Sequence, residues 1–221
     1  MPSPPPANAS PPRFAGSGLA CRRGDRLVFR DLDFAIETGG ALVLTGANGS
    51  GKSSLLRVMA GLTPPLLGAL AWDGAPLAED PAPHRARVHF IGHQDALKPV
   101  LTAAETLAFW ARIRGGSAAT VPAALARFHL DELADGPCRF LSAGQRRRLA
   151  LARLLASPAP LWLLDEPTTG LDEASVADLV AAIAEHRAGG GIVVLATHQP
   201  LAIATPQFLA LTDFSPRRSA A

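Results

Sequence analysis

ALVLTGANGSGKS, at residues 41–53, is the stretch that decides the fold of this 221-residue chain. Its first five residues form an apolar run typical of a buried strand, and helical character begins at Ser53 and continues to Gly61. Between them lies a glycine-rich turn with the pattern G-x-x-x-x-G-K-S. In such a turn successive backbone N–H groups point inward, and the positive end of the following helix adds to their attraction for anions. The stretch therefore predicts a phosphate-binding loop.

Two side chains of this loop have predicted roles on a nucleotide. Lys52 can reach the β and γ phosphates, and the Ser53 hydroxyl can bind the Mg²⁺ that bridges the terminal phosphates. The alternative is a glycine-rich turn with an incidental lysine, but Lys52 is one of only two lysines in the chain, the other being Lys98. We expect the phosphates of ATP to contact the loop and the start of the helix, at Gly46, Ala47, Asn48, Gly49, Ser50, Gly51, Lys52, Ser53 and Ser54.

A pair of acids follows a second apolar run, LWLL at residues 161–164. Asp165 and Glu166 thus emerge at the C-terminal end of a predicted buried strand, the edge at which ligands of open α/β sheets collect. Asp165 is suited to hold Mg²⁺ through water, and Glu166 is suited to orient or deprotonate an attacking water. The alternative is two solvated acids that open a loop. Their occurrence beside a phosphate-binding loop favours a single nucleotide site.

Composition and charge exclude several classes of protein. Hydrophobic residues make up 48% of the chain, but the longest uncharged stretch, residues 188–212, is interrupted by glycines and prolines. A spanning helix needs roughly 20 predominantly apolar residues, so we expect none. The net charge of +2 gives no argument for nucleic-acid binding. Cys21 and Cys138 lie far apart without metal-site spacing, so we expect reduced thiols rather than a disulfide or zinc framework.

Strand-like and helical segments alternate along the chain, which predicts an α/β fold. We expect a disordered Pro-rich leader at 1–13, a domain at 14–215 with a helical subdomain at about 97–141, and a tail at 216–221. Thr102 and Glu105 form a capping-box pattern in an Ala-rich helical region at 102–141. The other predicted helices span 53–61, 141–156 and 173–186, and the predicted strands span 26–29, 32–37, 41–45, 68–72, 87–91, 161–164 and 191–197.

Three further features complete a set of motifs in a fixed order. LSAGQ at residues 141–145 precedes the LWLLDE segment, Gly170-Leu-Asp172 follows it, and His198 comes after the strand-like IVVLAT. Together with Gln94 and the phosphate loop, this order resembles that of the ABC ATPases. The resemblance covers Gly46 to His198 and implies a P-loop NTPase core with an antiparallel β subdomain and a helical subdomain.

The resemblance also implies roles for these residues. Two copies of the subunit would sandwich two ATP molecules head to tail, so that Ser142, Gly144 and Gln145 bind a phosphate held by the opposite subunit. It further implies that Asp172 and Gln94 contact ATP, that Gln94 also binds Mg²⁺, and that His198 acts in catalysis with Glu166 and Lys52. The alternatives are an ordinary N-cap for Ser142 and a loop histidine with a structural role for His198.

One position departs from the family pattern. The family usually has an aromatic residue about 23 positions before the phosphate loop, where it stacks on adenine, and this chain has no Tyr at all. Arg23 falls at that position. A guanidinium plane can stack on a base, so we expect Arg23 to replace the ring and base selectivity to be weaker.

Other segments resemble, more narrowly, the ATP-binding subunits of the haem export system of cytochrome c maturation. They are LACRRG at 19–24, GHQDALK at 92–98, LTAAE at 101–105 with Phe109-Trp110, and LSAGQRRR at 141–148. This resemblance implies a homodimer bound to an integral membrane permease of the CcmB type, with room for a further membrane subunit. It implies a peripheral position on the cytoplasmic face of the bacterial inner membrane. Within that system, ATP would drive haem export or the release of a haem-loaded periplasmic chaperone.

Several alternatives stay open at the level of sequence. The chain could serve another small-substrate ABC exporter, act as a non-transport ABC ATPase, or trap nucleotide without hydrolysing it, although Glu166 and His198 argue against a trap. Phe109 and Trp110 are candidates for contact with the membrane subunit, with core packing as the preferred interpretation. We expect the arginines at 146–148 to form a solvated helix face.

Overall fold

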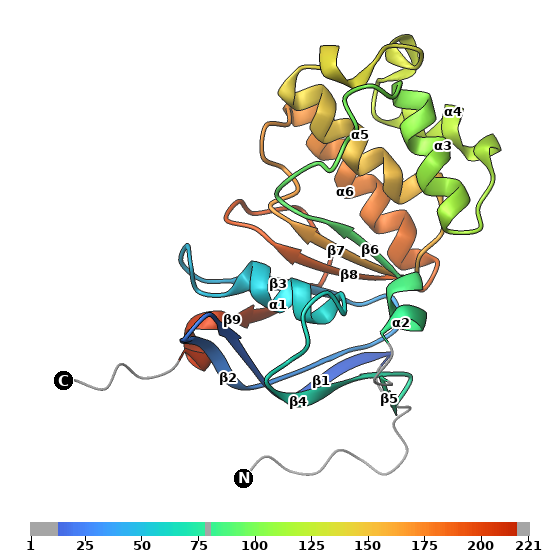
Figure 1. Cartoon of the computed structure of the whole chain (residues 1–221). Coiled ribbons are helices and arrows are strands. Elements are labelled where there is room, and N and C mark those ends of the chain that lie inside the picture. Colours follow the sequence, from blue (N-terminus) through green and yellow to red (C-terminus); the bar gives the residue numbers. More distant parts are fainter. Residues whose placement is uncertain (1–12, 78–80, 216–221) are drawn as a thin grey trace.

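The computed structural model describes residues 13–77 and 81–215, which form two sheets with helices between and above them (Figure 1). The first sheet is antiparallel in the order β2-β1-β4-β5, and the second is parallel in the order β6-β7-β8-β3-β9. The antiparallel sheet contains β1 (Phe14–Arg23), β2 (Arg26–Ile36), β4 (Leu67–Trp72) and β5 (Ala75–Pro76). The parallel sheet contains β3 (Ala41–Thr45), β6 (Val88–Ile91), β7 (Leu161–Asp165), β8 (Ile192–Ala196) and β9 (Gln207–Ala210).

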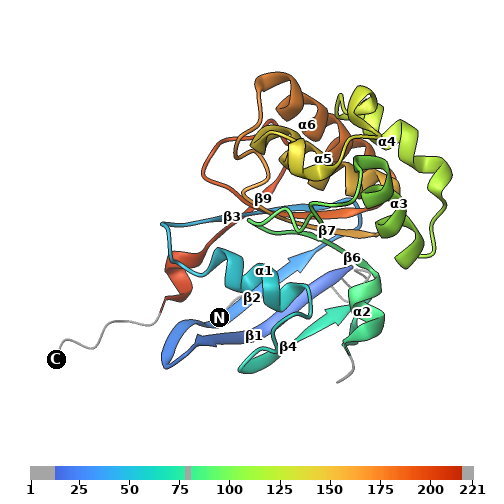
Figure 2. The same ribbon diagram turned by 45° about the horizontal axis from the view of Figure 1, so that its top comes forward.

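The helices divide between two layers. Helix α1 lies between the two sheets, and α3 to α6 cover the opposite face of the parallel sheet (Figures 1 and 2). The α-helices are α1 (Lys52–Met59), α2 (Ala82–Ala86), α3 (Ala103–Ile113), α4 (Val121–Arg127), α5 (Ala143–Ala156) and α6 (Glu173–Ala188). Short 3-10 turns span Ala118–Thr120, Asp131–Leu133, Cys138–Phe140 and Leu211–Phe214.

The parallel strands are buried on both faces, which explains why their sequences read as continuous apolar runs. Successive residues of β7 point to opposite sides: Leu161 and Leu163 join the core around α1, whereas Trp162 and Leu164 join the core beneath the upper helices. Every residue of β7 and of β8 is buried. These central strands therefore provide a rigid support for the loops that follow their C-terminal ends.

The predicted fold class is confirmed, with local differences. Strand β2 is one element rather than two, because the chain continues through an irregularity in register near Asp31, whose φ is 54°. The ten-residue β1 was not predicted, because its two glycines and its irregular register with β2 interrupt the alternation of apolar and polar residues. The short α2 and the strands β5 and β9 were not predicted either, since they carry too few residues for a periodic pattern. The capping box at Thr102 and Glu105 is present. None of the helices in the described part of the chain combines the length and apolarity that a bilayer crossing requires.

The ends of the domain are partly described. The predicted leader and tail lie outside the described residues, except for Arg13. Its guanidinium donates hydrogen bonds to both carboxylate oxygens of Asp73, each at 2.8 Å, and its carbonyl accepts from the Asp73 N–H. Arg13 is thus tied to the turn between β4 and β5.

Candidate functional site

The topology of the parallel sheet brings three loops together. Strand β8 lies between β7 and β3, and all three run in the same direction, so their C-terminal ends meet at one edge. The loop after β3 leads into Lys52, the first residue of α1. The turn after β7 carries Glu166, and the turn after β8 carries His198. The order of the strands therefore predicts that His198 lies between the other two side chains.

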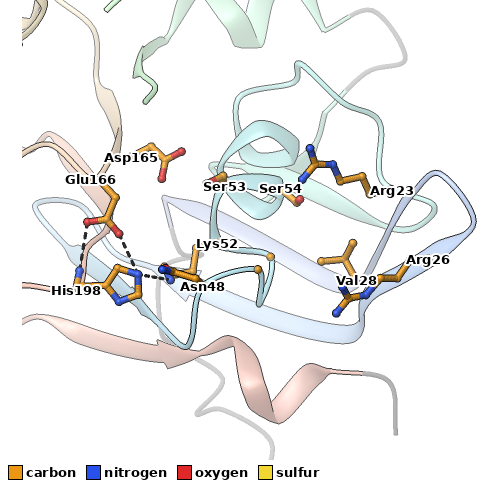
Figure 3. Close-up of a pocket in the computed structure, with 12 residues that line it drawn as sticks. Arg23, Arg26, Val28, Asn48, Lys52, Ser53, Ser54, Asp165, Glu166 and His198 are labelled. Atoms are coloured by element: carbon orange, nitrogen blue, oxygen red, sulfur yellow. Dashed lines mark hydrogen bonds and ion pairs between the residues drawn. The ribbon is translucent and has the colours of Figure 1, made fainter. Parts of the chain in front are cut away.

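The side chains at this edge form a chain of polar contacts (Figure 3). The Lys52 Nζ lies 3.1 Å from the His198 Nε2, and the same Nε2 lies 3.4 Å from the Glu166 Oε1. The His198 Nε2 can accept from Lys52 or, when it carries a proton, donate to Glu166, but not both at once. His198 is therefore able to exchange partners between the loop lysine and the carboxylate.

The glycine-rich loop is held open toward a cavity. Gly51 is the N-cap of α1 with φ 108° and makes no side-chain cap hydrogen bond, and a Cβ there would lie 2.4 Å from a methyl carbon of Val28. Only glycine fits this position without backbone strain and without displacing the Val28 side chain. The first amides of α1 are thus left to an anion rather than to a capping side chain. Lys52 is 8% exposed and donates to the carbonyls of Gly46 at 2.7 Å and Ala47 at 3.3 Å.

The acidic end of the site has an unusual backbone. Glu166 adopts a left-handed conformation with φ 47°, which costs a residue other than glycine roughly 1–3 kcal/mol. Its N–H donates to the Ala196 carbonyl at 2.8 Å, so the turn stays attached to β8. Asp165 is 5% exposed at the end of β7. The Asp165 carboxylate and the Ser53 hydroxyl supply hard oxygen donors of the kind that suit Mg²⁺.

A cavity of about 320 Å³ connects these groups to the β1–β2 hairpin. Arg23, Arg26 and Val28 line its far end (Figure 3). Arg23 is one of the residues predicted to contact the nucleotide, and it lines this cavity, whereas Arg26 and Val28 were not predicted. The signal that could have found them is the two-residue turn at Gly24 and Asp25, because it places Arg26 directly opposite Arg23. The complete lining is Arg23, Arg26, Val28, Asn48, Gly49, Gly51, Lys52, Ser53, Ser54, Asp165, Glu166 and His198.

Eight predicted site residues lie outside this cavity lining. Three belong to the glycine-rich loop itself, and five come from elsewhere in the chain: Gly46, Ala47 and Ser50, and Gln94, Ser142, Gly144, Gln145 and Asp172. Gln94 is exposed in the segment after β6. Ser142 is the N-cap of α5 and shares a capping box with Gln145. Asp172 caps α6, and its hydrogen bonds with Ser175 lower the pKa of the Asp172 carboxyl. One chain therefore assembles only part of the predicted set.

The predicted solvated face at residues 146–148 is wrong. Arg147 is 5% exposed, and its two neighbours are half-buried. Consecutive helical residues are about 100° apart, so a run of three cannot share one face, and the middle arginine points into the molecule. For the predicted membrane contact, Phe109 is 41% exposed, whereas Trp110 is half-buried with the Arg153 guanidinium 3.8 Å from its ring centre.

Comparison with known proteins adds a family. The sequence profile described as ABC transporter matches residues 29–169. The chain is 57% identical over 208 residues to the cytochrome c biogenesis ATP-binding export protein CcmA of Paramagnetospirillum magneticum, covering 91% of this chain and 95% of that protein. It is 53% identical over 212 residues to the protein of the same name from Rhodospirillum rubrum, covering 96% and 91% respectively.

Solved structures agree on the fold. An ABC transporter ATP-binding protein from Pyrococcus furiosus superposes with a TM-score of 0.80 at 23% identity, covering 92% of this chain and 99% of that one. A dimeric ATP-binding cassette in a post-hydrolysis state, bound to ADP and Pi, superposes with a TM-score of 0.76 at 25% identity, covering 84% and 88%.

Proposed function

The chain belongs to the ABC transporter family of ATP-hydrolysing subunits, and we propose that it powers the haem export system of cytochrome c maturation. The names of its relatives from two organisms support this assignment. The observation that carries the catalytic part is the chain of contacts from Lys52 through His198 to Glu166 across one cavity.

The residues of this cavity divide the work of hydrolysis. The open N-terminus of α1 and Lys52 bind the phosphates and stabilise the charge that develops on the departing γ-phosphoryl group. Glu166 orients or deprotonates the attacking water, and His198 holds the Glu166 carboxylate in place through its backbone N–H at 3.4 Å and its ring. Because His198 also faces Lys52, it joins the two halves of the reaction centre.

Mg²⁺ fits the donors at the floor of the cavity. Ser53 and Asp165 would hold it, with Gln94 as a further ligand from the segment after β6. The ion prefers one or two carboxylates combined with substrate phosphates and water, which matches this donor set. When bound, it offsets the charge of the terminal phosphates.

A second copy of the chain completes the site. Ser142, Gly144, Gln145 and Asp172 lie outside the cavity lining of their own chain, so in our proposal they serve the nucleotide of the opposite subunit. The same head-to-tail dimer would sit on a CcmB-like permease, with a further membrane subunit where one is present. We accordingly propose a peripheral position on the cytoplasmic face of the bacterial inner membrane.

The experiment for catalysis replaces the proposed base. Glu166→Gln keeps the shape of the side chain but removes its charge, so ATP still binds and turnover falls about 100- to 1,000-fold. Glu185→Gln is the matched control, because Glu185 pairs with Arg127 on the surface and lies outside the cavity lining. Full turnover in Glu166→Gln would refute the assigned role.

The experiment for the biological role removes the protein from its cell. Loss of c-type cytochromes with b-type cytochromes retained is the expected outcome. Normal c-type maturation would overturn the haem-system assignment and leave a generic transporter ATPase.

The two arginines at the far end of the cavity form the proposed base subsite. Arg23 and Arg26 are paired across the hairpin, where like charges disfavour the strand pairing. Within the described residues neither guanidinium has a hydrogen bond or an ion pair. A base stacked on a guanidinium, with Val28 as an apolar contact, would occupy this arrangement. Because stacking is tolerant of base identity, we expect ATP and GTP to bind with similar affinity.

A substitution series tests the base subsite. Arg23→Ala and Arg26→Ala should each weaken binding of both nucleotides by about 5- to 10-fold. Arg30→Ala, another exposed arginine of β2 outside the cavity lining, is the control. A strict preference for ATP over GTP that is unchanged in Arg23→Ala would contradict the proposed base subsite.

A further inference from the structure

Arg147 is the most completely bonded side chain near the candidate site, and none of the roles above uses it. It projects from the first turns of α5 into the interior and is 5% exposed. A buried guanidinium is strongly disfavoured unless its donors are satisfied. The partners of Arg147 therefore show what its position serves.

Its guanidinium reaches five acceptors. The Nε donates to the Pro167 carbonyl at 3.2 Å, and the Nη2 donates to the carbonyls of Asp165 at 2.9 Å and Glu166 at 2.7 Å. The Nη1 donates to the Gly92 carbonyl at 2.9 Å and to the Asp95 Oδ1 at 3.1 Å. An arginine has five N–H donors in a rigid fork, so these five contacts use its full capacity.

Three of the acceptors are consecutive carbonyls, at residues 165 to 167. Successive carbonyls of a strand point in opposite directions, so three can converge on one group only where the chain turns. The turn is made at Glu166 by its left-handed backbone. The guanidinium thus holds the backbone from one side, while the Glu166 carboxylate faces His198.

The remaining two acceptors belong to another loop. Gly92 and Asp95 flank Gln94 in the segment after β6, and β6 is the sheet neighbour of β7. A displacement of this segment would change the hydrogen bonds of the Nη1. The position of the guanidinium beneath the Glu166 backbone would change as a result. One side chain therefore joins the Gln94 segment to the backbone of the acidic turn.

We propose that Arg147 is a positioning residue for ATP hydrolysis: it fixes the Glu166 carboxylate at its working position and transmits to it the state of the segment at 92–95. The inference rests on the proposed role of Glu166, since Arg147 acts only through the turn that carries this carboxylate. Within the described residues, the only hydrogen bonds of the Arg147 side chain to the cavity lining are those to the backbone carbonyls of Asp165 and Glu166.

The first test is Arg147→Lys with steady-state ATPase kinetics on the full chain. Lysine keeps the charge but has one donor group, so it cannot hold three carbonyls and the Gln94 segment together. We expect kcat to fall about 10- to 100-fold, as for loss of a supporting residue around a reacting group. KM for ATP should stay within about threefold, because the phosphate loop is untouched.

Arg153→Lys is the matched control. Arg153 lies on the same helix and is also 5% exposed, but its guanidinium stacks on Trp110 rather than on the acidic turn. We expect its kcat to stay within about twofold of the original value even if the protein is less stable. An equal fall of kcat in both variants, or an unchanged kcat in Arg147→Lys, would overturn the proposal.

A second variant decides the question if Arg147→Lys does not fold. Asp95→Ala removes one acceptor at a half-buried position and leaves Arg147 its four carbonyls. We expect kcat per folded molecule to fall about 3- to 5-fold with KM unchanged. Thermal stability should also fall, because one donor of a buried guanidinium loses its acceptor. An unaltered kcat would contradict the link to the segment at 92–95.

The outcome is separable from that for Glu166. If Glu166→Gln abolishes turnover while Arg147→Lys and Asp95→Ala leave it intact, only the role of Arg147 fails. If Glu166→Gln retains turnover, the proposed role of Glu166 is refuted, and the role of Arg147, which depends on it, is refuted as well.

Discussion

Two helices of this chain begin in opposite ways. Helix α1 begins at Gly51, which offers no side chain to its first amides, and these amides border the cavity. Helix α5 begins at Ser142, whose Oγ accepts from the Gln145 N–H at 3.2 Å while the Gln145 Oε1 accepts from the Ser142 N–H at 2.7 Å. One N-terminus is therefore open to an anion, and the other is closed by its own side chains.

The two kinds of N-terminus suggest how one nucleotide site can be divided between two subunits. An open N-terminus binds phosphate directly, because its amides have no competing partner. A capped N-terminus must exchange its internal hydrogen bonds for phosphate, and such an exchange is favourable only for a strongly charged ligand already held nearby. We infer that α1 binds nucleotide first and that α5 contributes only when the opposite subunit presents a bound nucleotide.

The strongest test of the open terminus is Lys52→Ala. Lys52 adds the only lysine charge to the cavity lining, so its loss should lower turnover about 100- to 1,000-fold and weaken nucleotide binding as well. ATPase kinetics and nucleotide titration of the isolated chain measure both. Lys98→Ala removes the other lysine, which lies 5.4 Å from the Phe109 ring, and should change neither quantity. Normal turnover in Lys52→Ala would contradict the proposed role of the α1 N-terminus in ATP hydrolysis.

Ser142→Ala tests the closed terminus and should have a smaller effect. Loss of a hydrogen bond to a charged phosphate predicts a fall in turnover of about 10- to 100-fold. Nucleotide binding to the single chain should stay within about twofold, because Ser142 lies outside the cavity lining. Weakened binding to the monomer would contradict the division of the site between two subunits.

The position of the phosphate loop and of the acidic pair was largely predictable from the sequence, whereas the contacts that hold the acidic turn in place were not. The phosphate loop and Asp165-Glu166 follow apolar strands, so a local pattern and the rule for parallel sheets locate them. Arg147 could not be found in this way, because its burial depends on how α5 packs over the turn after β7. From sequence alone, a run of three arginines predicts a solvated helix face, and only the packing of α5 in the fold shows that the middle arginine is buried.

The β1–β2 hairpin shows the same limit. Arg23 was found through its distance from the phosphate loop, but Arg26 and Val28 enter the cavity only through the register of the hairpin. Cross-strand register is fixed by turn geometry, which a reading of separate strand segments does not include.

A buried histidine at the C-terminal end of α5 makes the free energy of unfolding depend on pH. The His89 Nε2 donates to the carbonyl of Ser157, the C-cap residue of α5, at 2.9 Å. The His89 Nδ1 is buried and has no hydrogen-bond partner among the described residues. Burial, reinforced by the charge of Arg114, lowers the pKa of His89 from 6.5 to about 3. His89 is therefore neutral in the folded protein.

The sign of the effect follows from this lowered pKa. The unfolded chain takes up the proton below about pH 6.5 and the folded chain only near pH 3, so stability is lost as the pH falls through this window. Between pH 7 and pH 5 His89 alone should cost about 2 kcal/mol, roughly 30-fold in the unfolding equilibrium. Urea unfolding at several pH values measures the slope. His89→Gln should flatten it, whereas His129→Gln, at an exposed histidine, should not.

The smallest expected effect comes from the other capping box, at the start of α3. The Thr102 Oγ1 accepts from the Glu105 N–H at 3.1 Å, and the Glu105 Oε2 accepts from the Thr102 N–H at 2.8 Å, which matches the arrangement at α5. Thr102→Ala should therefore destabilise the protein by about 1 kcal/mol, as Ser142→Ala should, while turnover per folded molecule stays the same. Thermal unfolding and ATPase assays of the two variants side by side separate capping from catalysis. A fall in turnover of equal size in both would mean that loss of a cap alone explains the Ser142 result, and α5 would then have no phosphate of its own to bind.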